Sequence, residues 1–234
     1  LSVLCAREIK LNGTSRTDAG VHAYGQRASF EGEFGIPTDR IARAANNLLA
    51  GSMNNMQIGD VRIVRAEEVS ADFHARFDAK GKRYIYKINN SGNENVFRRN
   101  YEYFVGKPLD LAAMRKAAAQ IIGRHDFACF QAAGGQIRKT TVRRIFDLSV
   151  ETAGAKEASL AVEAAGTEED ANARRGNIEI SVVGDGFLYN MVRIITGTLV
   201  DVGLGKIKAE DVAGIIESRD RQRAGHTAPP QGLY

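Results

Sequence analysis

The most informative segment of the chain is Arg16-Thr17-Asp18-Ala19-Gly20-Val21-His22-Ala23. It sets a carboxylate two residues after a guanidinium and two residues before a glycine, just ahead of a stretch that is typical of a strand. Gly20 accepts backbone angles that other residues resist, so a tight turn is predicted here. The neighbouring guanidinium favours the ionised form of Asp18. Two interpretations fit this pattern: a capped surface turn with an ion pair, or a charged acid kept for nucleophilic or electrostatic work.

The composition is that of a globular protein without disulfide or zinc cross-links. Of 234 residues, 44% are hydrophobic and 26% charged, and the only cysteines, Cys5 and Cys129, lie far apart. Four scattered histidines add no zinc-binding spacing, so none of them is assigned a metal or general-base role. No run approaches the roughly 18 apolar residues of a membrane span. We therefore expect a cytoplasmic protein with reduced thiols, no metal, no cofactor and no membrane contact.

The charge pattern favours a polyanionic partner. The net charge of +4 is only a weak indication. The cations are clustered, however, and several clusters on one chain predict a surface that contacts phosphates. The clustered residues are Lys80, Lys82, Arg83, Arg98, Arg99, Arg138, Lys139, Arg143, Arg144, Arg219, Arg221 and Arg223.

Hydrophobic spacing predicts a mixture of helices and strands. In the first third of the chain we expect the end of a helix within 1–11, a strand over 21–30, a helix from 37 to 51, a loop over 51–60 and a strand over 61–69. Further along we expect strands over 82–89, 140–150 and 178–183, helices over 110–122, 188–199 and 211–218, and an extended tail over 228–234. Residues 151–176 are rich in Ala and Glu, and they are typical of a poorly ordered excursion or, alternatively, a short helix.

Hairpins outnumber parallel crossovers in this order of elements, which favours an α+β fold with mainly antiparallel sheet. A change between two units of similar content falls near residues 75–80. We therefore predict an N-terminal α+β domain over 1–76, which carries Asp18, and a C-terminal α+β domain over 77–234.

The segment Arg16–Ala23 resembles the active-site segment of the TruA family of tRNA pseudouridine synthases. Four further segments resemble the family in order and at similar spacing: Asp72–Phe77, Lys82–Tyr86, Gly186–Arg193 and Ala224–Leu233. The resemblance implies two α+β units, each like an RNA-recognition or ferredoxin motif, joined around a central cleft. It also implies that the family's first strand and last strand lie outside this sequence.

The resemblance carries site roles onto individual residues. Asp18 matches the nucleophile, Arg16 the arginine beside it, Tyr84 the tyrosine that stacks on the target uracil, and Leu233 an apolar wall of the pocket. Without the resemblance, the favoured interpretation of Tyr84 is a core strand tyrosine with its hydroxyl at the surface. For Leu233 the alternative is plain core packing, which is compatible with the wall role. Arg193 comes from an otherwise apolar helix and so needs a partner, for which Asp18 is the leading candidate. The alternative is that Arg193 extends to solvent at the helix end.

The implied activity is isomerisation of uridine to pseudouridine in the tRNA anticodon stem-loop, at positions 38 to 40. The implied enzyme is a homodimer that flips the uridine out of its stack and needs no cofactor. The chemical path through C1′, C6 or C2′ stays open. A non-catalytic RNA-binding protein that keeps the scaffold is the alternative, and an aspartate-dependent glycosidase is a third hypothesis.

Overall fold

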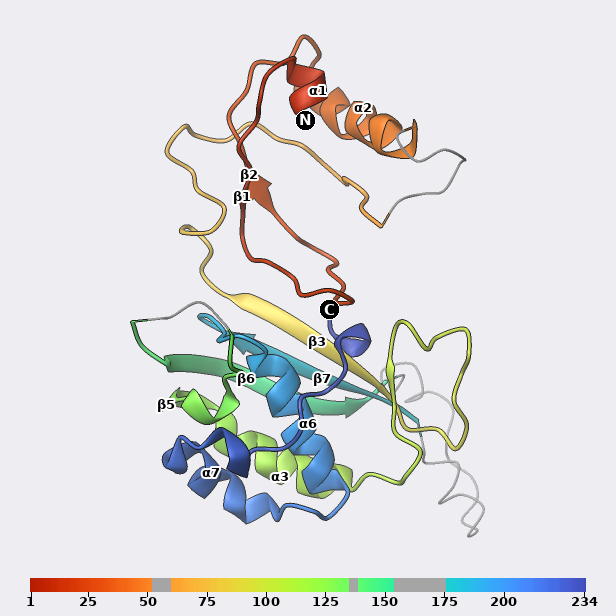
Figure 1. Ribbon diagram of the computed structural model, residues 1–234, viewed down its shortest axis with the longest axis vertical. Coiled ribbons are helices and arrows are strands. Elements are labelled where there is room, and N and C mark those ends of the chain that lie inside the picture. Colours follow the sequence, from red (N-terminus) through yellow and green to blue (C-terminus); the bar gives the residue numbers. More distant parts are fainter. Residues whose placement is uncertain (52–59, 135–138, 154–175) are drawn as a thin grey trace, which may run out of the picture. The chain divides into compact units, whose positions relative to one another are not determined.

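The computed structural model describes residues 1–51, 60–134, 139–153 and 176–234. The chain forms two compact units, Leu1–Arg16 with Gly25–Ala79 and Thr17–Tyr24 with Lys80–Tyr234 (Figure 1). These ranges differ from the predicted 1–76 and 77–234 because Thr17–Tyr24, which contains Asp18, packs within the second unit. The chain therefore enters the second unit at Thr17 and returns to the first unit at Gly25.

The first unit is built on a short antiparallel strand pair and two helices. Its elements are α1 (Ser2–Cys5), β1 (Asn12–Gly13), β2 (Ala28–Ser29) and α2 (Thr38–Gly51). The helix predicted over 37–51 is confirmed. Asp39 lies in its first turn, where a negative charge complements the helix dipole.

Two strand predictions in this unit are wrong. Of the strand expected over 21–30, only Ala28–Ser29 forms, and residues 61–69 form no strand. In the second case a side chain takes the place of a neighbouring strand. Asn46 of α2 donates to the carbonyl of Ile63 and accepts from its N–H, both at 2.8 Å. The loop predicted over 51–60 falls mostly on 52–59, outside the described residues.

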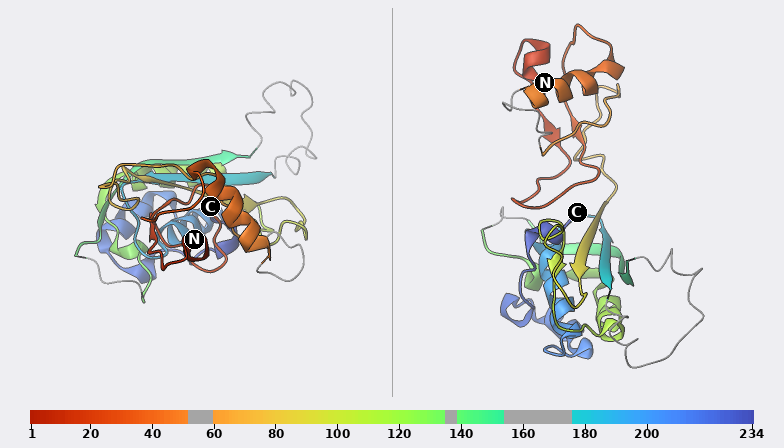
Figure 2. Two further views of the ribbon diagram at one scale, coloured as in Figure 1. Left: turned by 90° about the horizontal axis from the view of Figure 1, so that it is seen from above. Right: turned by 90° about the vertical axis from the view of Figure 1, so that its right-hand side faces the viewer.

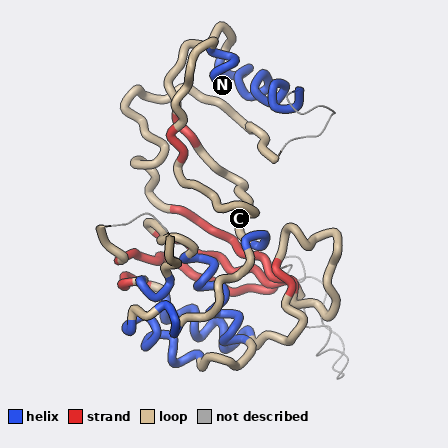
Figure 3. Tube along the Cα trace, viewed as in Figure 1, coloured by secondary structure: helices blue, strands red, loops and turns tan. Residues whose placement is uncertain are grey.

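The second unit contains a five-stranded sheet in the order β4-β3-β7-β6-β5 (Figures 1 and 3). Its strands are β3 (Lys82–Asn89), β4 (Tyr103–Phe104), β5 (Gly123–Asp126), β6 (Val142–Thr152) and β7 (Asn177–Gly184). All pairs are antiparallel except β3–β4. The predicted α+β class with mainly antiparallel sheet is confirmed. Neither β4 nor β5 was predicted from the sequence, because both strands are too short for an alternation of period two to be visible.

Three helices pack against one face of this sheet: α3 (Leu111–Ile121), α6 (Met191–Gly203) and α7 (Val212–Ser218) (Figure 2). Asp110 caps α3 by accepting a hydrogen bond from the N–H of Ala113 at 3.0 Å. Helix α6 begins at Met191 rather than Leu188 because Asn190 adopts a left-handed backbone, with φ of 57°. Every residue of α6 except Arg193 is buried, so this helix lies in the core.

The C-terminal tail adds to the edge of β3 (Figure 1). It forms a 3-10 turn at Pro230–Gly232, where the sequence had predicted a fully extended chain. Leu233 then pairs with Tyr86, and Tyr234 exchanges two backbone hydrogen bonds of 2.8 Å with Ile85. The tail therefore fills the part of this edge that β4 does not reach.

Of the predicted excursion over 151–176, residues 154–175 lie outside the described part of the chain. Among the described helices, none has the length and apolar character required to cross a membrane.

Thr196 in α6 is fully buried, and its hydroxyl has no hydrogen-bond partner among the described residues. Thr196→Val removes this unpaired group and keeps the branched shape, so we expect the free energy of unfolding to rise by about 1 kcal/mol. Thr198→Val is the matched control, because the Thr198 hydroxyl donates to Ile194 and accepts from Gly225. It should lose about 1–2 kcal/mol. Urea unfolding measures both values, and equal losses in the two variants would contradict this description of α6.

Candidate active site

Asp18 lies on a tight turn of the second unit. The N–H of Val21 donates to the carbonyl of Asp18 at 3.1 Å, and Gly20 has a φ of 81°. This left-handed backbone favours glycine, so the turn predicted from the sequence forms as expected. The turn rests on the C-terminal tail, because a Cβ at Gly20 would lie 3.1 Å from Cγ of Pro230. The Asp18 side chain is 38% exposed, which leaves its carboxylate accessible to a substrate.

The turn and the tail are joined by one backbone hydrogen bond. The N–H of His22 donates to the carbonyl of Leu233 at 2.9 Å. Leu233 is buried and pairs with Tyr86 of β3. This hydrogen bond therefore joins the Asp18 turn to Leu233, near the other end of the chain, and β3 holds the tail in place.

Arg193 is held next to the Asp18 carboxylate by its own hydrogen bonds. Its Nε donates to the carbonyl of Ala228 at 2.7 Å, and Nη1 donates to Oδ1 of Asn190 at 3.0 Å. Nη1 also lies 3.9 Å from Oδ2 of Asp18, the partner that the sequence suggested. A direct charge-assisted hydrogen bond would be about 1 Å shorter. The cation thus lies beside the carboxylate without occupying it.

Tyr84 and Arg16 have different surroundings. Tyr84 is half-buried on β3, and its ring meets the ring of Phe187 edge to face, with 4.9 Å between the centroids. Arg16 is exposed and belongs to the range of the first unit. Of the site residues predicted from the sequence, Asp18, Tyr84, Arg193 and Leu233 share the second unit.

Tyr86 was not predicted as a site residue, yet it holds the tail that carries Leu233. Its hydroxyl donates to the carbonyl of Pro229 at 2.6 Å. Burial raises the pKa of this phenol far above its ordinary value of 10, so Tyr86 remains a neutral donor. A Cβ at Gly232 would lie 2.7 Å from the Tyr86 ring, which explains why the tail needs glycine there. The sequence predicted the strand that carries Tyr86, but no local signal indicated the distant partner of its hydroxyl.

A second anchor of the tail is a buried carboxylate of α6. Oδ2 of Asp201 lies 2.9 Å from Nδ1 of His226 and accepts from the His226 backbone N–H, while Oδ1 accepts from Lys206 at 2.9 Å. Burial alone would raise the pKa of Asp201, but the hydrogen bonds from His226 and Lys206 outweigh it and lower the pKa below the usual 3.8. The structure thus gives His226 a structural contact.

This carboxylate predicts a pH dependence of stability. Because the folded state lowers the pKa of Asp201, its contribution is complete above the unfolded pKa and is lost as the pH falls through the folded value. At pH 7 we expect Asp201→Asn to cost on the order of 2 kcal/mol, since the three hydrogen bonds to the carboxylate lose their charge assistance. Thermal unfolding of the wild type and of this variant between pH 7 and 3 measures the difference. The difference should begin to shrink below about pH 4, where the carboxylate of the unfolded chain takes up a proton, and should be lost as the pH falls through the lower pKa of the folded state. A constant difference across that range would contradict the assignment.

Part of the predicted basic surface also serves the fold. The guanidinium of Arg221 donates to the carbonyl of Gly225 at 2.9 Å and to Oγ1 of Thr227 at 3.0 Å. Arg219 forms an ion pair of 3.3 Å with Asp126. These two cations are therefore less available to phosphates than the sequence suggested.

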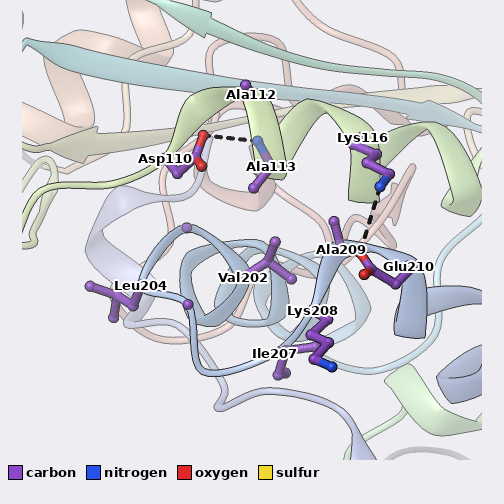
Figure 4. A pocket seen from close by; sticks show the side chains of 12 residues that line it. Asp110, Ala112, Ala113, Lys116, Val202, Leu204, Ile207, Lys208, Ala209 and Glu210 are labelled. Atoms are coloured by element: carbon purple, nitrogen blue, oxygen red, sulfur yellow. Dashed lines mark hydrogen bonds and ion pairs between the residues drawn. The ribbon is translucent and has the colours of Figure 1, made fainter.

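A surface hollow of about 640 Å³ lies where α3 meets the end of α6 (Figure 4). Lys116 and Glu210 line it and form an ion pair of 3.6 Å. None of the predicted site residues lines this hollow. Within the ranges that the structure describes, no group of three or more His, Cys, Asp or Glu side chains is placed to hold a metal ion.

Comparison with known proteins places the chain among RNA-modifying enzymes. A sequence profile described as tRNA pseudouridine synthase matches residues 117–234. The chain is 44% identical to tRNA pseudouridine synthase A of Acetivibrio thermocellus, over 99% of this chain and 82% of the relative. The identity to the enzyme of the same name from Ruminiclostridium cellulolyticum is 45%, over 100% of this chain and 84% of the relative. The identity to tRNA pseudouridine synthase A of Halalkalibacterium halodurans is 41%, over 96% of this chain and 74% of the relative. The profile includes Arg193 and Leu233, and the second alignment also includes Asp18.

Proposed function

The chain belongs to the tRNA pseudouridine synthase family, and from that premise we propose that it isomerises uridine to pseudouridine in tRNA with Asp18 as the nucleophile. The observation that carries the proposal is the position of Asp18. Its carboxylate is accessible, lies on a turn fixed to the Leu233 tail, and has Arg193 at 3.9 Å.

The reaction moves one bond within a single nucleotide. The N1–C1′ bond breaks, the uracil rotates, and C5 bonds to C1′, while C5 loses its proton and N1 gains one. Uracil leaves as a delocalised anion. A strong general acid that protonates the leaving group is therefore less necessary here than in ordinary glycoside hydrolysis. One ionised carboxylate then suffices to stabilise C1′ covalently or electrostatically. Arg193 supports this step because its positive charge lies 3.9 Å from the carboxylate and leaves the carboxylate oxygens accessible to the substrate.

The other predicted residues bind and enclose the base. Tyr84 stacks on the flipped uracil, and its edge contact with Phe187 keeps its ring in one orientation. Leu233 forms an apolar wall that helps to exclude water, so that the uracil is not lost. Arg16 fills the space that the flipped nucleotide leaves.

The substrate region in this proposal is the anticodon stem-loop, at positions 38 to 40. The exposed cations of the second unit contact the phosphates, since folded RNA is recognised mostly by shape and backbone. The working form is a cytoplasmic homodimer with the tRNA lying across both subunits.

Tritium release from tRNA labelled at C5 of uridine tests the proposal. The wild type should release tritium, and chromatography of the digested product should give pseudouridine. Free uracil would point instead to a glycosidase. Binding of tRNA with no release by the purified protein would favour a non-catalytic RNA-binding protein.

A further inference from the structure

Four aromatic rings form a column next to the Asp18 turn. The rings of Tyr101, His22, Tyr234 and Tyr24 follow one another with centroid separations of 5.2, 4.7 and 4.8 Å. Adjacent ring planes differ by 25°, 21° and 14°, so the stacking is close to parallel throughout. The column therefore joins the Asp18 segment, the loop before β4 and the C-terminal tail.

The inner rings of the column are fixed by hydrogen bonds. Nε2 of His22 lies 2.9 Å from the carbonyl of Asn100, to which it donates. The Tyr234 hydroxyl donates to the carbonyl of Tyr101 at 2.9 Å. The backbone of Tyr234 is paired with β3, so the stack rests on the sheet of the second unit.

Tyr24, the outermost ring, is both exposed and held in place. It is 70% exposed, although its ring lies nearly parallel to Tyr234. Nζ of Lys87 donates to its hydroxyl at 2.8 Å and lies farther, at 5.3 Å, from its ring centre. The same ammonium lies 4.5 Å from the centre of the Tyr234 ring. One side of Tyr24 is thus packed, its hydroxyl is bound, and most of the residue faces solvent.

Such a ring is suited to bind a nucleobase. Sites for unpaired RNA combine aromatic faces that stack on bases with cations that contact the backbone. Because the orientation of Tyr24 is already fixed, a base that stacks on it loses little binding free energy to the entropy cost of immobilising the side chain. The ammonium of Lys87 beside the ring favours a phosphate-bearing ligand over an apolar protein surface.

The position of Tyr24 in the chain connects it with the reaction. It follows Asp18 by six residues, which in a fully extended chain span at most about 20 Å. Flipping a uridine toward Asp18 leaves the neighbouring bases without their stacking partner. We propose that Tyr24 is a stacking platform for an unpaired base next to the target uridine, with Lys87 contacting the adjoining phosphate. This inference rests on the proposed function, because it assumes an RNA substrate at Asp18.

A thermodynamic cycle between protein and RNA variants tests the platform. Affinities of the full chain are measured by fluorescence anisotropy for an anticodon stem-loop RNA, and for two RNAs that lack the base 5′ or 3′ of the target uridine. Tyr24→Leu should weaken binding of the intact RNA about 5- to 100-fold, the range that stacking of one base accounts for. Tyr24→Phe keeps the ring and should retain most of the affinity.

The abasic RNAs decide the interpretation. On one of them the loss caused by Tyr24→Leu should disappear, since the base that stacks is already missing. Phe146→Leu is the control, because Phe146 is also an exposed ring beside a cation, with the Arg144 guanidinium 5.6 Å away. Any loss that it causes should be the same on intact and abasic RNA.

Three results would overturn the platform. Tyr24→Leu could leave the affinity for the intact RNA unchanged, it could weaken binding of both abasic RNAs as much as of the intact RNA, or it could weaken binding because the oligomeric mass of the variant differs from that of the wild type. Equal thermal midpoints for Tyr24→Leu and the wild type exclude misfolding as the cause. The cycle measures binding alone, so a parallel assay of pseudouridine formation by the wild type keeps the two proposals apart. If Tyr24→Leu shows the expected pattern of binding but the wild type forms no pseudouridine, the proposed reaction is rejected. If pseudouridine forms but the binding pattern is absent, only the platform is rejected.

Discussion

Asp18→Asn is expected to lower the single-turnover rate of pseudouridine formation by about 10³-fold or more. The amide has nearly the same shape, and the turn is closed by the Asp18 carbonyl rather than by its side chain, so the backbone should be unchanged. What is lost is the negative charge that stabilises C1′. Binding of tRNA should persist or become tighter, because an anionic group near the RNA phosphates is removed.

Asp220→Asn is the matched control for this variant. The Asp220 side chain accepts from the N–H of Gln222 at 2.9 Å at the start of a 3-10 turn, and asparagine fills such a capping position equally well. It should keep wild-type activity. A wild-type rate for Asp18→Asn, measured by rapid quench with enzyme in excess, would reject Asp18 as the nucleophile.

Gly197→Ala is expected to lower the free energy of unfolding by at least about 2 kcal/mol, with a parallel loss of activity. A Cβ at this position of α6 would overlap the carbonyl oxygen of His226 and lie 2.8 Å from its carbonyl carbon. The tail cannot easily retreat, because the Ala228 N–H is bonded to the Arg193 carbonyl at 3.0 Å. The gain of up to about 1 kcal/mol in helix propensity is too small to offset this clash. Any shift of the tail also moves Leu233, on which the Asp18 segment rests.

Gly214→Ala is the control for the second variant. Gly214 is also a helical glycine, in α7, but a Cβ there would have no neighbour within 4 Å. It should be neutral or stabilising by up to about 1 kcal/mol. Equal stability of the two alanine variants in urea unfolding would show that the tail does not pack on α6 as described.

The elements that the sequence predicted well are those with strong local signals. Helix α3 has an apolar spacing and an Asp110 cap, and β3 has a clear alternation, so both appear within a residue or two of their predicted bounds. Residues 61–69 alternate in a similar way, yet Asn46 pairs with Ile63 where a neighbouring strand was expected. Which partner a strand-like segment finds depends on distant residues, and the local pattern does not contain that information.

The same reasoning applies to the candidate site. The turn around Asp18 and its glycine were readable from the sequence, and the need of Arg193 for an acidic partner followed from its apolar helix. The packing of Asp18 within the second unit could not be predicted from the sequence, because it depends on a hydrogen bond between His22 and Leu233, which lie far apart in the chain. The aromatic column was missed for the same reason, since its four rings come from three distant segments.

The most direct test of the central claim is a map of pseudouridine in an unmodified tRNA transcript after incubation with the purified wild-type protein. Digestion to short fragments and mass spectrometry of a C5-deuterated transcript locate each converted uridine, because isomerisation exchanges that deuterium for hydrogen. We expect conversion within positions 38 to 40, no release of free uracil, and no conversion by Asp18→Asn. A transcript that binds the wild-type protein and stays unconverted, or that Asp18→Asn converts equally well, would contradict the assignment of this turn as a uridine-isomerising site.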